Sequence, residues 1–278
     1  MNTRAMVITT LLLIGPAQGM DHSAPVPVSE LSHIHGVVLP RGSQDILLAT
    51  HHGLFAVDAA GSARMISDVA DDFMGFVGSP DGKLYASGHP QQGGNTGVIG
   101  AADQNAPWSR LSPGANGPVD FHAMTVSPAE PDVLYGSYGG IQVSRDAGRT
   151  WTVAGPGPDG LIDLAAAADE AGHLYAGTTQ GLFESRDFGA SWTVVAAEGQ
   201  AVSSVEVASD GILRAFIAGD GLYALEAETM TKLGAMTESI ILHMAFDSDD
   251  TELAIAVTQG SEVLSSTDGG KSWSPLVP

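Results

Sequence analysis

The sequence predicts an all-β protein built as a single β-propeller, most consistent with six four-stranded blades. Three observations predict this fold class. The motif S-x-D-x-G-x-x-W occurs three times in the chain. Short apolar strand patterns recur about every 41 residues, close to the ~40–45 residues of a four-stranded propeller blade. No stretch shows the 3.6-residue periodicity of an amphipathic helix.

The repeated motif predicts a tight turn with a buried ring beside it. Its three copies span 144–151, 185–192 and 266–273. The aspartate can bond to the backbone of its own turn, and the glycine permits a positive φ. The tryptophan can bury a large ring between neighbouring sheets. Degenerate copies occupy 57–65, 101–108 and 225–233. The motif is therefore interpreted as structural rather than catalytic.

Two strand patterns precede each turn and define the repeating unit. The first strand of each unit is expected within 33–39, 72–77, 120–126, 161–167, 202–208 and 240–246. The second strand is expected within 46–50, 84–87, 134–137, 174–177, 213–216 and 253–256. Each unit thus has three strands, the turn motif and a fourth strand. Six such units place the propeller at residues 31–278.

The N-terminus has the pattern of an export signal. Arg4 is followed by an apolar stretch of about ten residues, too short to span a membrane and typical of a signal peptide. Ala17 and Gly19 offer a cleavage site before Met20. We expect a signal peptide at 1–19, an extended linker at 20–30, and a periplasmic or secreted protein.

Composition excludes several partners. The formal net charge is −21, with only 11 Lys and Arg residues, so nucleic acid and anionic membranes are not expected partners. The chain has no cysteine, so a metal would be held by His, Met, carboxylate or backbone oxygen. A closed propeller needs no partner for stability, so we expect a monomer.

Histidines gather at equivalent positions of the first three units. In a propeller, the first strand of each blade lines the central channel. The start of that strand and the loop between strands two and three open on the same face. Superposing the units aligns His35, Met74 and His122. Later units place Asp163, Ser203 or Ser204, and His243 or a neighbour at the same position.

The stretches "THHG" and "ASGHP" follow the second strands of units one and two, so His52 corresponds to His89 and His51 is additional. Any one of these histidines could be a satisfied polar core group, but their grouping predicts a shared site. Imidazole with thioether is the ligand set of a soft transition metal, which favours copper, with zinc as the alternative. The predicted metal ligands are His35, His51, His52, Met74, His89 and His122.

The three turn motifs and the series "HIHG…THHG…DFMGF…ASGHP…DFHAM…LYGSYGG" resemble a family of exported bacterial propellers, the BNR or Asp-box repeat family. That superfamily includes sialidases, sortilin-like receptors and photosystem II assembly factors, and its members are often described as glycosyl-hydrolase-like. A sialidase needs clustered arginines, whereas Arg145, Arg149 and Arg186 lie inside the turn motifs. Asp72, Asp120 and Asp163 could supply a glycosidase acid pair. Because Asp72 and Asp120 each precede a Phe, a repeated structural role is the alternative.

Three functions follow from these patterns. The favoured hypothesis is a non-enzymatic periplasmic propeller that binds a metal ion, handles copper or helps to load a cupro-protein. The second is a glycosyl hydrolase or sugar-binding propeller that uses carboxylates on the same face. The third is a protein-interaction or assembly scaffold.

Overall fold

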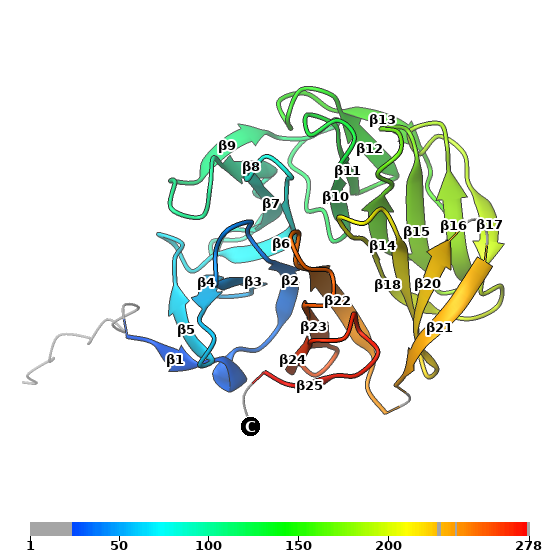
Figure 1. Ribbon diagram of the computed structural model, residues 1–278. Helices are drawn as coiled ribbons and strands as arrows, with labels where there is room; N and C mark the ends of the chain where they lie inside the picture. Colours follow the sequence, from blue (N-terminus) through cyan, green and yellow to red (C-terminus); the bar gives the residue numbers. More distant parts are fainter. Residues whose placement is uncertain (1–23, 227–228, 237, 277–278) are drawn as a thin grey trace, which may run out of the picture.

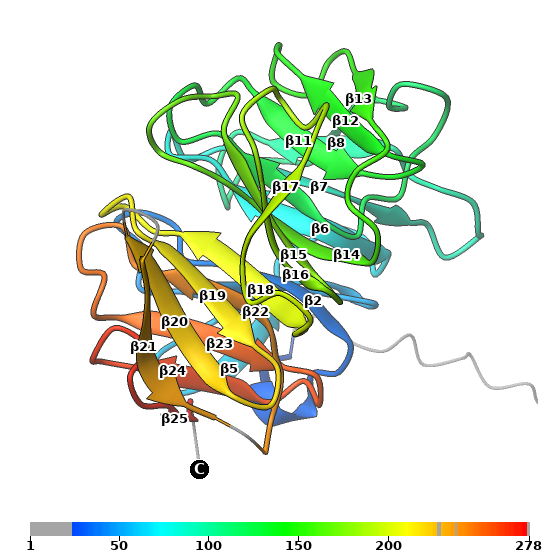
Figure 2. The ribbon, with the colours of Figure 1, turned by 90° about the vertical axis from the view of Figure 1, so that its right-hand side faces the viewer.

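The computed structural model describes residues 24–226, 229–236 and 238–276. In this part of the chain, antiparallel sheets form a ring, and the protein is a six-bladed β-propeller as predicted (Figure 1). The expected signal peptide at 1–19 lies outside the described residues. Figure 2 shows the molecule turned by 90°, with β18, β19, β20 and β21 lying side by side as one blade.

Within each blade the strands pair in chain order, from the channel outward. Blades one to three comprise β2 (Ile34–Val38), β3 (Ile46–Thr50), β4 (Gly53–Val57) and β5 (Ser62–Met65); β6 (Asp72–Gly78), β7 (Leu84–His89), β8 (Val98–Ala101) and β9 (Ser109–Ser112); and β10 (Met124–Val126), β11 (Leu134–Ser137), β12 (Ile141–Ser144) and β13 (Thr152–Gly155). Blades four to six comprise β14 (Leu161–Ala166), β15 (Leu174–Thr178), β16 (Gly181–Ser185) and β17 (Thr193–Ala196); β18 (Val202–Val207), β19 (Leu213–Ile217), β20 (Gly221–Glu226) and β21 (Thr229–Ala235); and β22 (Ile241–Phe246), β23 (Ala254–Thr258), β24 (Val263–Ser266) and β25 (Ser274–Pro275).

The first strand of blade three is shorter than its pattern predicts. The backbone at 120–122 leaves the sheet and is held by a side chain of blade two instead. The amide of Phe121 donates to the hydroxyl of Ser87 at 2.7 Å, and that hydroxyl donates to the Phe121 carbonyl at 3.2 Å. This irregular segment is therefore fixed between two blades.

The turn motifs connect the third and fourth strands of their blades, as expected. In the first copy, the hydroxyl of Ser144 donates to Asp146 at 2.9 Å and accepts from the amide of Gly148 at 2.9 Å. The amide of Thr150 donates to Asp146 at 2.8 Å. The indole of Trp151 donates to the Gly148 carbonyl at 3.0 Å. Each group of the motif thus has a structural task.

Apolar clusters between neighbouring blades form the core. At the seam that closes the ring, Ile34 and Leu48 of blade one pack with Val257 of blade six. The same cluster contains Val28, which is only 3% exposed. A short strand, β1 (Val26–Pro27), also pairs with β5. The propeller therefore begins before residue 31, because part of the expected linker buries apolar surface in this seam.

Helical structure is nearly absent from the described residues. They contain one 3₁₀ turn, η1 (Val28–Glu30). None of the helices in the described part of the chain has the length and apolarity needed to cross a membrane.

Candidate metal centre

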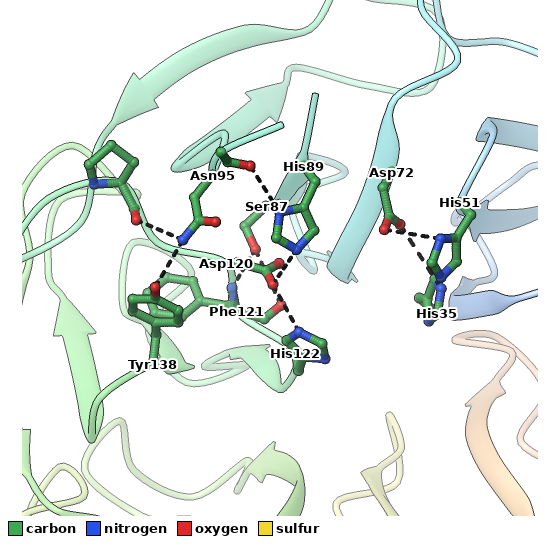
Figure 3. Close-up of polar contacts among 12 residues, drawn as sticks. His35, His51, Asp72, Ser87, His89, Asn95, Asp120, Phe121, His122 and Tyr138 are labelled. Carbon is green, nitrogen blue, oxygen red and sulfur yellow. Dashed lines mark hydrogen bonds and ion pairs between the residues drawn. The ribbon is translucent and has the colours of Figure 1, made fainter. Parts of the chain in front are cut away.

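Two groups of imidazole and carboxylate side chains meet on one face of blades one to three (Figure 3). Cluster one consists of His35, His51 and Asp72, and cluster two consists of His89, Asp120 and His122. In each group, one possible ligand atom per residue lies within 4.8 Å of the others. His35 is the second residue of β2, and the other five lie at strand ends or in the segments between strands. All six lie on the face that the repeat analysis selected.

Cluster one joins blades one and two. His35 comes from the innermost strand β2, His51 from the turn between β3 and β4, and Asp72 from the start of β6. The Nδ1 atom of His51 lies 3.3 Å from Asp72 Oδ2, and the Nε2 atom of His35 lies 4.0 Å from Asp72 Oδ1. Both atoms of the longer contact are buried and have no hydrogen-bond partner among the described residues. Two unpartnered polar atoms therefore face each other across a short gap.

The electrostatics of cluster one keep His35 neutral. Burial, with further effects of His51 and His243, lowers the pKa of His35 to about 4. Its Nε2 or Nδ1 lone pair is thus free at neutral pH, as a metal ligand requires. Burial also raises the pKa of Asp72, against the opposing effect of His51. The cluster lacks a permanent positive charge to balance that carboxylate, and a cation would supply one.

Cluster two joins blades two and three around one oxygen atom. The Nε2 atoms of His89 and His122 each lie 2.8 Å from Oδ2 of Asp120. Asp120 is 4% exposed, whereas both imidazoles reach the surface. Its second oxygen, Oδ1, is buried and has no hydrogen-bond partner among the described residues. Figure 3 shows both rings pointing at this carboxylate.

The hydrogen bond made by Nδ1 of His89 determines whether its Nε2 carries a proton. Nδ1 of His89 lies 2.9 Å from the Gly94 carbonyl and must donate to it. Nε2 of the neutral ring would then turn a lone pair toward the carboxylate of Asp120. That arrangement is favourable only if a proton or a metal ion lies between the two atoms. A backbone carbonyl is one of the usual partners of the second nitrogen of a metal-bound histidine.

Charges within cluster two reinforce one another. The hydrogen bond to Gly94 is the largest cause of a raised pKa at His89, and the hydrogen bond to Asp120 raises the pKa of His122. Burial alone would raise the pKa of Asp120, but the bonds with His122 and His89 outweigh it and hold that pKa below its ordinary range. Without a metal, each shift favours the charged form of its group, so the two imidazoles and the carboxylate stabilise one another as ions.

The separations in both clusters suit a transition metal. With bonds of about 2.0–2.2 Å, two tetrahedral ligands of one ion lie about 3.3–3.6 Å apart. Contacts of 2.8 Å in cluster two and of 3.3 and 4.0 Å in cluster one bracket this spacing. Small side-chain shifts would therefore admit an ion. Two imidazoles and one carboxylate leave further coordination positions open to water or another ligand.

One hairpin links the clusters. Asp72 of cluster one and His89 of cluster two are directly paired across β6 and β7. Between them, Gly88 has a φ of +133°, and a Cβ atom there would collide with the Asp72 carbonyl. Glycine is required at this position because the two backbones approach so closely.

Among the predicted histidine ligands, His52 belongs to neither cluster. His52 is exposed, and its ring centroid lies 6.5 Å from that of His51. Met74 is buried, 6% exposed, and is paired with Ser87 on β7. His35, His51, His89 and His122 are the predicted residues that the structure brings together.

The strand register corrects one alignment. His35 lies at a bulge, because Ile34 pairs with Thr50 and Gly36 with Ala49. Asp163 and His243 instead pair directly with residues of the neighbouring strand. The expected equivalence of Asp163 with His35 is therefore wrong by one position, and in blade six a neighbour of His243 is the equivalent residue. The strands of blades four and six have the same bulge, at Ile162 and Leu242, and these two residues are the counterparts of His35.

Sequence reasoning missed the carboxylates as ligands. Asp72 and Asp120 were interpreted as a glycosidase pair or as repeated structural residues, yet each lies between two histidines. The signal was present in the repeated "DF" dipeptide, which places an aspartate beside each histidine-bearing loop.

The clusters border the central channel. A cavity of about 460 Å³ runs along the inner strands of all six blades, and His35 and His122 line it. Asp163, Glu206 and His243 face the same cavity from blades four, five and six. Burial and the neighbouring Asp163 raise the pKa of Glu206 to about 8. The channel therefore holds several titratable groups besides the two clusters.

The fold and these clusters define a six-bladed β-propeller with a candidate metal centre at one face. No protein-family model matches the chain, and no curated protein matches its sequence. A GH74 enzyme from Niastella koreensis is structurally similar, with a TM-score of 0.64 and 19% identity over 88% of this chain. The match spans 45% of the length of that enzyme.

Two other similar solved structures are matched over most of their own length. A protein provisionally assigned as a gluconolactonase gives a TM-score of 0.65 at 12% identity, covering 87% of this chain and 91% of that one. YCF48 bound to D1 peptide gives a TM-score of 0.55 at 13% identity, covering 94% and 86%. At such identities these similarities establish the propeller fold.

Proposed function

We propose that the protein is a metal-binding propeller in which cluster one and cluster two each hold a divalent transition-metal ion. The role is binding and handling of the ion rather than catalysis. The two carboxylates anchor the ions at depth, and the more exposed imidazoles face solvent, where an ion can be gained or released.

A single arrangement carries the proposal. Both imidazoles of cluster two direct Nε2 at one oxygen of Asp120 over 2.8 Å, while the other nitrogen of His89 is committed to Gly94. A group that converges two nitrogen donors and a buried carboxylate is suited to a cation. Cluster one repeats the composition one blade earlier, with two unpartnered buried atoms 4.0 Å apart.

The donor set guides the choice of metal. Imidazole and carboxylate favour borderline divalent ions, and among these Cu²⁺ binds more tightly than Zn²⁺. A preference for Cu⁺ would need a thioether ligand, and the two clusters are defined by imidazole and carboxylate groups. We therefore propose Cu²⁺ first and Zn²⁺ second. The export signal expected at 1–19 and the Asp-box resemblance fit a periplasmic protein that delivers copper to a cupro-protein.

Metal stoichiometry tests the proposal directly. The metal-free full chain is dialysed against Cu²⁺ or Zn²⁺ with excess Mg²⁺, which competes for surface carboxylates but poorly for imidazole. The wild type should retain two ions per chain, and His35→Ala and His122→Ala should each retain one. Elemental analysis gives the count, and electron paramagnetic resonance of the Cu²⁺ form should show nitrogen ligands.

A matched control separates site loss from general damage. His173→Gln removes an imidazole that is held between Asp169 and Glu184 in blade four, away from both clusters. It should retain both ions, with circular dichroism verifying the fold of every variant. Equal metal content in the wild type, His35→Ala and His122→Ala would refute the proposal.

A glycosyl hydrolase is the second candidate, supported by the fold shared with the GH74 enzyme and by an acid pair in the channel. Asp163 and Glu206 face the same cavity, and burial raises the pKa of Asp163 to about 6. Hydrolysis of an aryl-glycoside that survives His35→Ala and His122→Ala but is lost in Glu206→Gln would favour this candidate.

A further inference from the structure

Two exposed histidines flank cluster one without belonging to it. His33 precedes β2, and its ring packs edge-on against His51 with centroids 4.8 Å apart. His52 follows His51 in the turn after β3, with ring centroids 6.5 Å apart. Both side chains face solvent. His51 therefore has an exposed imidazole on either side.

Together with cluster one, these residues form a series graded by burial. His33, His52 and His51 are all exposed, whereas the side chain of His35 is 21% exposed and that of Asp72 13%. The ring of His51 lies 4.4 Å from that of His35. The series thus runs from three exposed imidazoles through the partly buried His35 to a carboxylate.

The backbone at His33 is strained. Its φ is +53°, in the left-handed region that non-glycine residues rarely adopt. The conformation is held by the neighbouring turn, because the amide of His51 donates to the His33 carbonyl at 3.3 Å. This hydrogen bond therefore links the position of His33 to that of His51, which is a member of cluster one.

We propose that His33 and His52 are loading ligands, which take a metal ion from a soluble carrier and pass it through His51 into cluster one. The inference rests on the proposed metal-binding function. A carrier releases its ion one donor bond at a time, so the first acceptor must project far enough to reach an ion that is still chelated. Asp72 and His35 are too deep for this step. With metal–nitrogen bonds of about 2 Å, imidazoles as close as His33 and His51 can bind one ion at the same time.

The rate of loading tests the proposal. Cu²⁺ bound to nitrilotriacetate is mixed with the metal-free full chain, and uptake is followed by stopped-flow absorbance. The variant carrying both His33→Asn and His52→Asn should load cluster one at least tenfold more slowly than the wild type. Its final stoichiometry and affinity should be unchanged, because both ions keep their permanent ligands. Asparagine suits this test because it tolerates the left-handed conformation.

A second variant separates the imidazole from the strain. His33→Gly relaxes the backbone and also removes the ring, so it should slow loading as much as His33→Asn does. Loading at the wild-type rate in the double variant would overturn the proposal. Lost stoichiometry would also overturn it, because the two residues would then be permanent ligands. If the wild type itself takes up no metal, the proposed function fails as well, and that outcome is distinct from the other two.

Discussion

At the scale of single residues, two aspartates organise the candidate site. Asp120 lies almost wholly below the surface and meets two imidazoles through one oxygen atom. Asp72 is partly buried and faces the two imidazoles of cluster one with a different oxygen for each, at 4.0 Å and 3.3 Å. A buried carboxylate without a full set of hydrogen bonds is costly, so each acid needs a cation, either imidazolium or metal. Metal affinity should therefore depend on the acids as much as on the histidines.

Glu206 gives a prediction about pH at the same scale. Burial in the channel, with Asp163 beside it and Arg214 opposing, raises its pKa from 4.5 to about 8. The folded protein therefore holds a proton that the unfolded chain has lost between these pH values. The contribution of this proton to the free energy of unfolding is fully present below pH 4.5 and is lost as pH rises through about 8. We expect metal-free Glu206→Gln to be more stable than the wild type above that pH.

Melting temperatures at about pH 5 and about pH 9 measure this effect. The gain in Glu206→Gln should be confined to the alkaline condition, since glutamine is uncharged at both. His35, His122 and His243 line the same channel and are common to both proteins, so their titration cancels in the comparison. An identical pH profile in the two proteins would contradict the prediction.

At the scale of elements, the turn motifs hold neighbouring blades together through their tryptophans. Trp151 is 7% exposed and packs against Phe121 with ring centroids 5.0 Å apart. Phe121 lies between Asp120 and His122 in the sequence. The first turn motif therefore supports the irregular segment that carries two ligands of cluster two, although the motif itself takes no part in the site.

Removing the ring of Trp151 should be strongly destabilising. We expect Trp151→Ala to reduce the free energy of unfolding by about 3–5 kcal/mol, because it deletes a buried aromatic ring. Trp192→Ala should cost less, since Trp192 occupies the same position of the second motif but is only partly buried. Urea denaturation of both variants tests this ranking. A larger loss for Trp192→Ala would show that burial of the ring is not what the motif contributes.

At the scale of the whole molecule, repulsion among the negative charges opposes the apolar packing that closes the ring. Apolar packing between blades one and six closes the ring at a seam that includes Leu48 and Val257. A net charge of −21 spread over the surface repels itself and favours opening. The metal-free protein should therefore become more stable as salt screens this repulsion, with a screening length of about 10 Å at 0.1 M.

A salt series provides the measurement. The melting temperature of the metal-free chain should rise from low salt to about 0.5 M salt as the screening length shortens. Sodium chloride and choline chloride should act alike, because screening does not depend on the identity of the cation. A fall in melting temperature, or an effect of one salt alone, would contradict the electrostatic origin.

The sequence by itself determined the number, order and internal plan of the blades, because strand patterns and turn motifs are local and repeat along the chain. It also selected the face and four of the imidazoles that meet there. Only the tertiary structure decided that His51 rather than His52 turns inward, and that Asp72 and Asp120 lie at the centre of the clusters. Side-chain direction depends on bulges, on a two-residue turn and on contacts between blades, which residues distant in sequence impose only once the ring has closed.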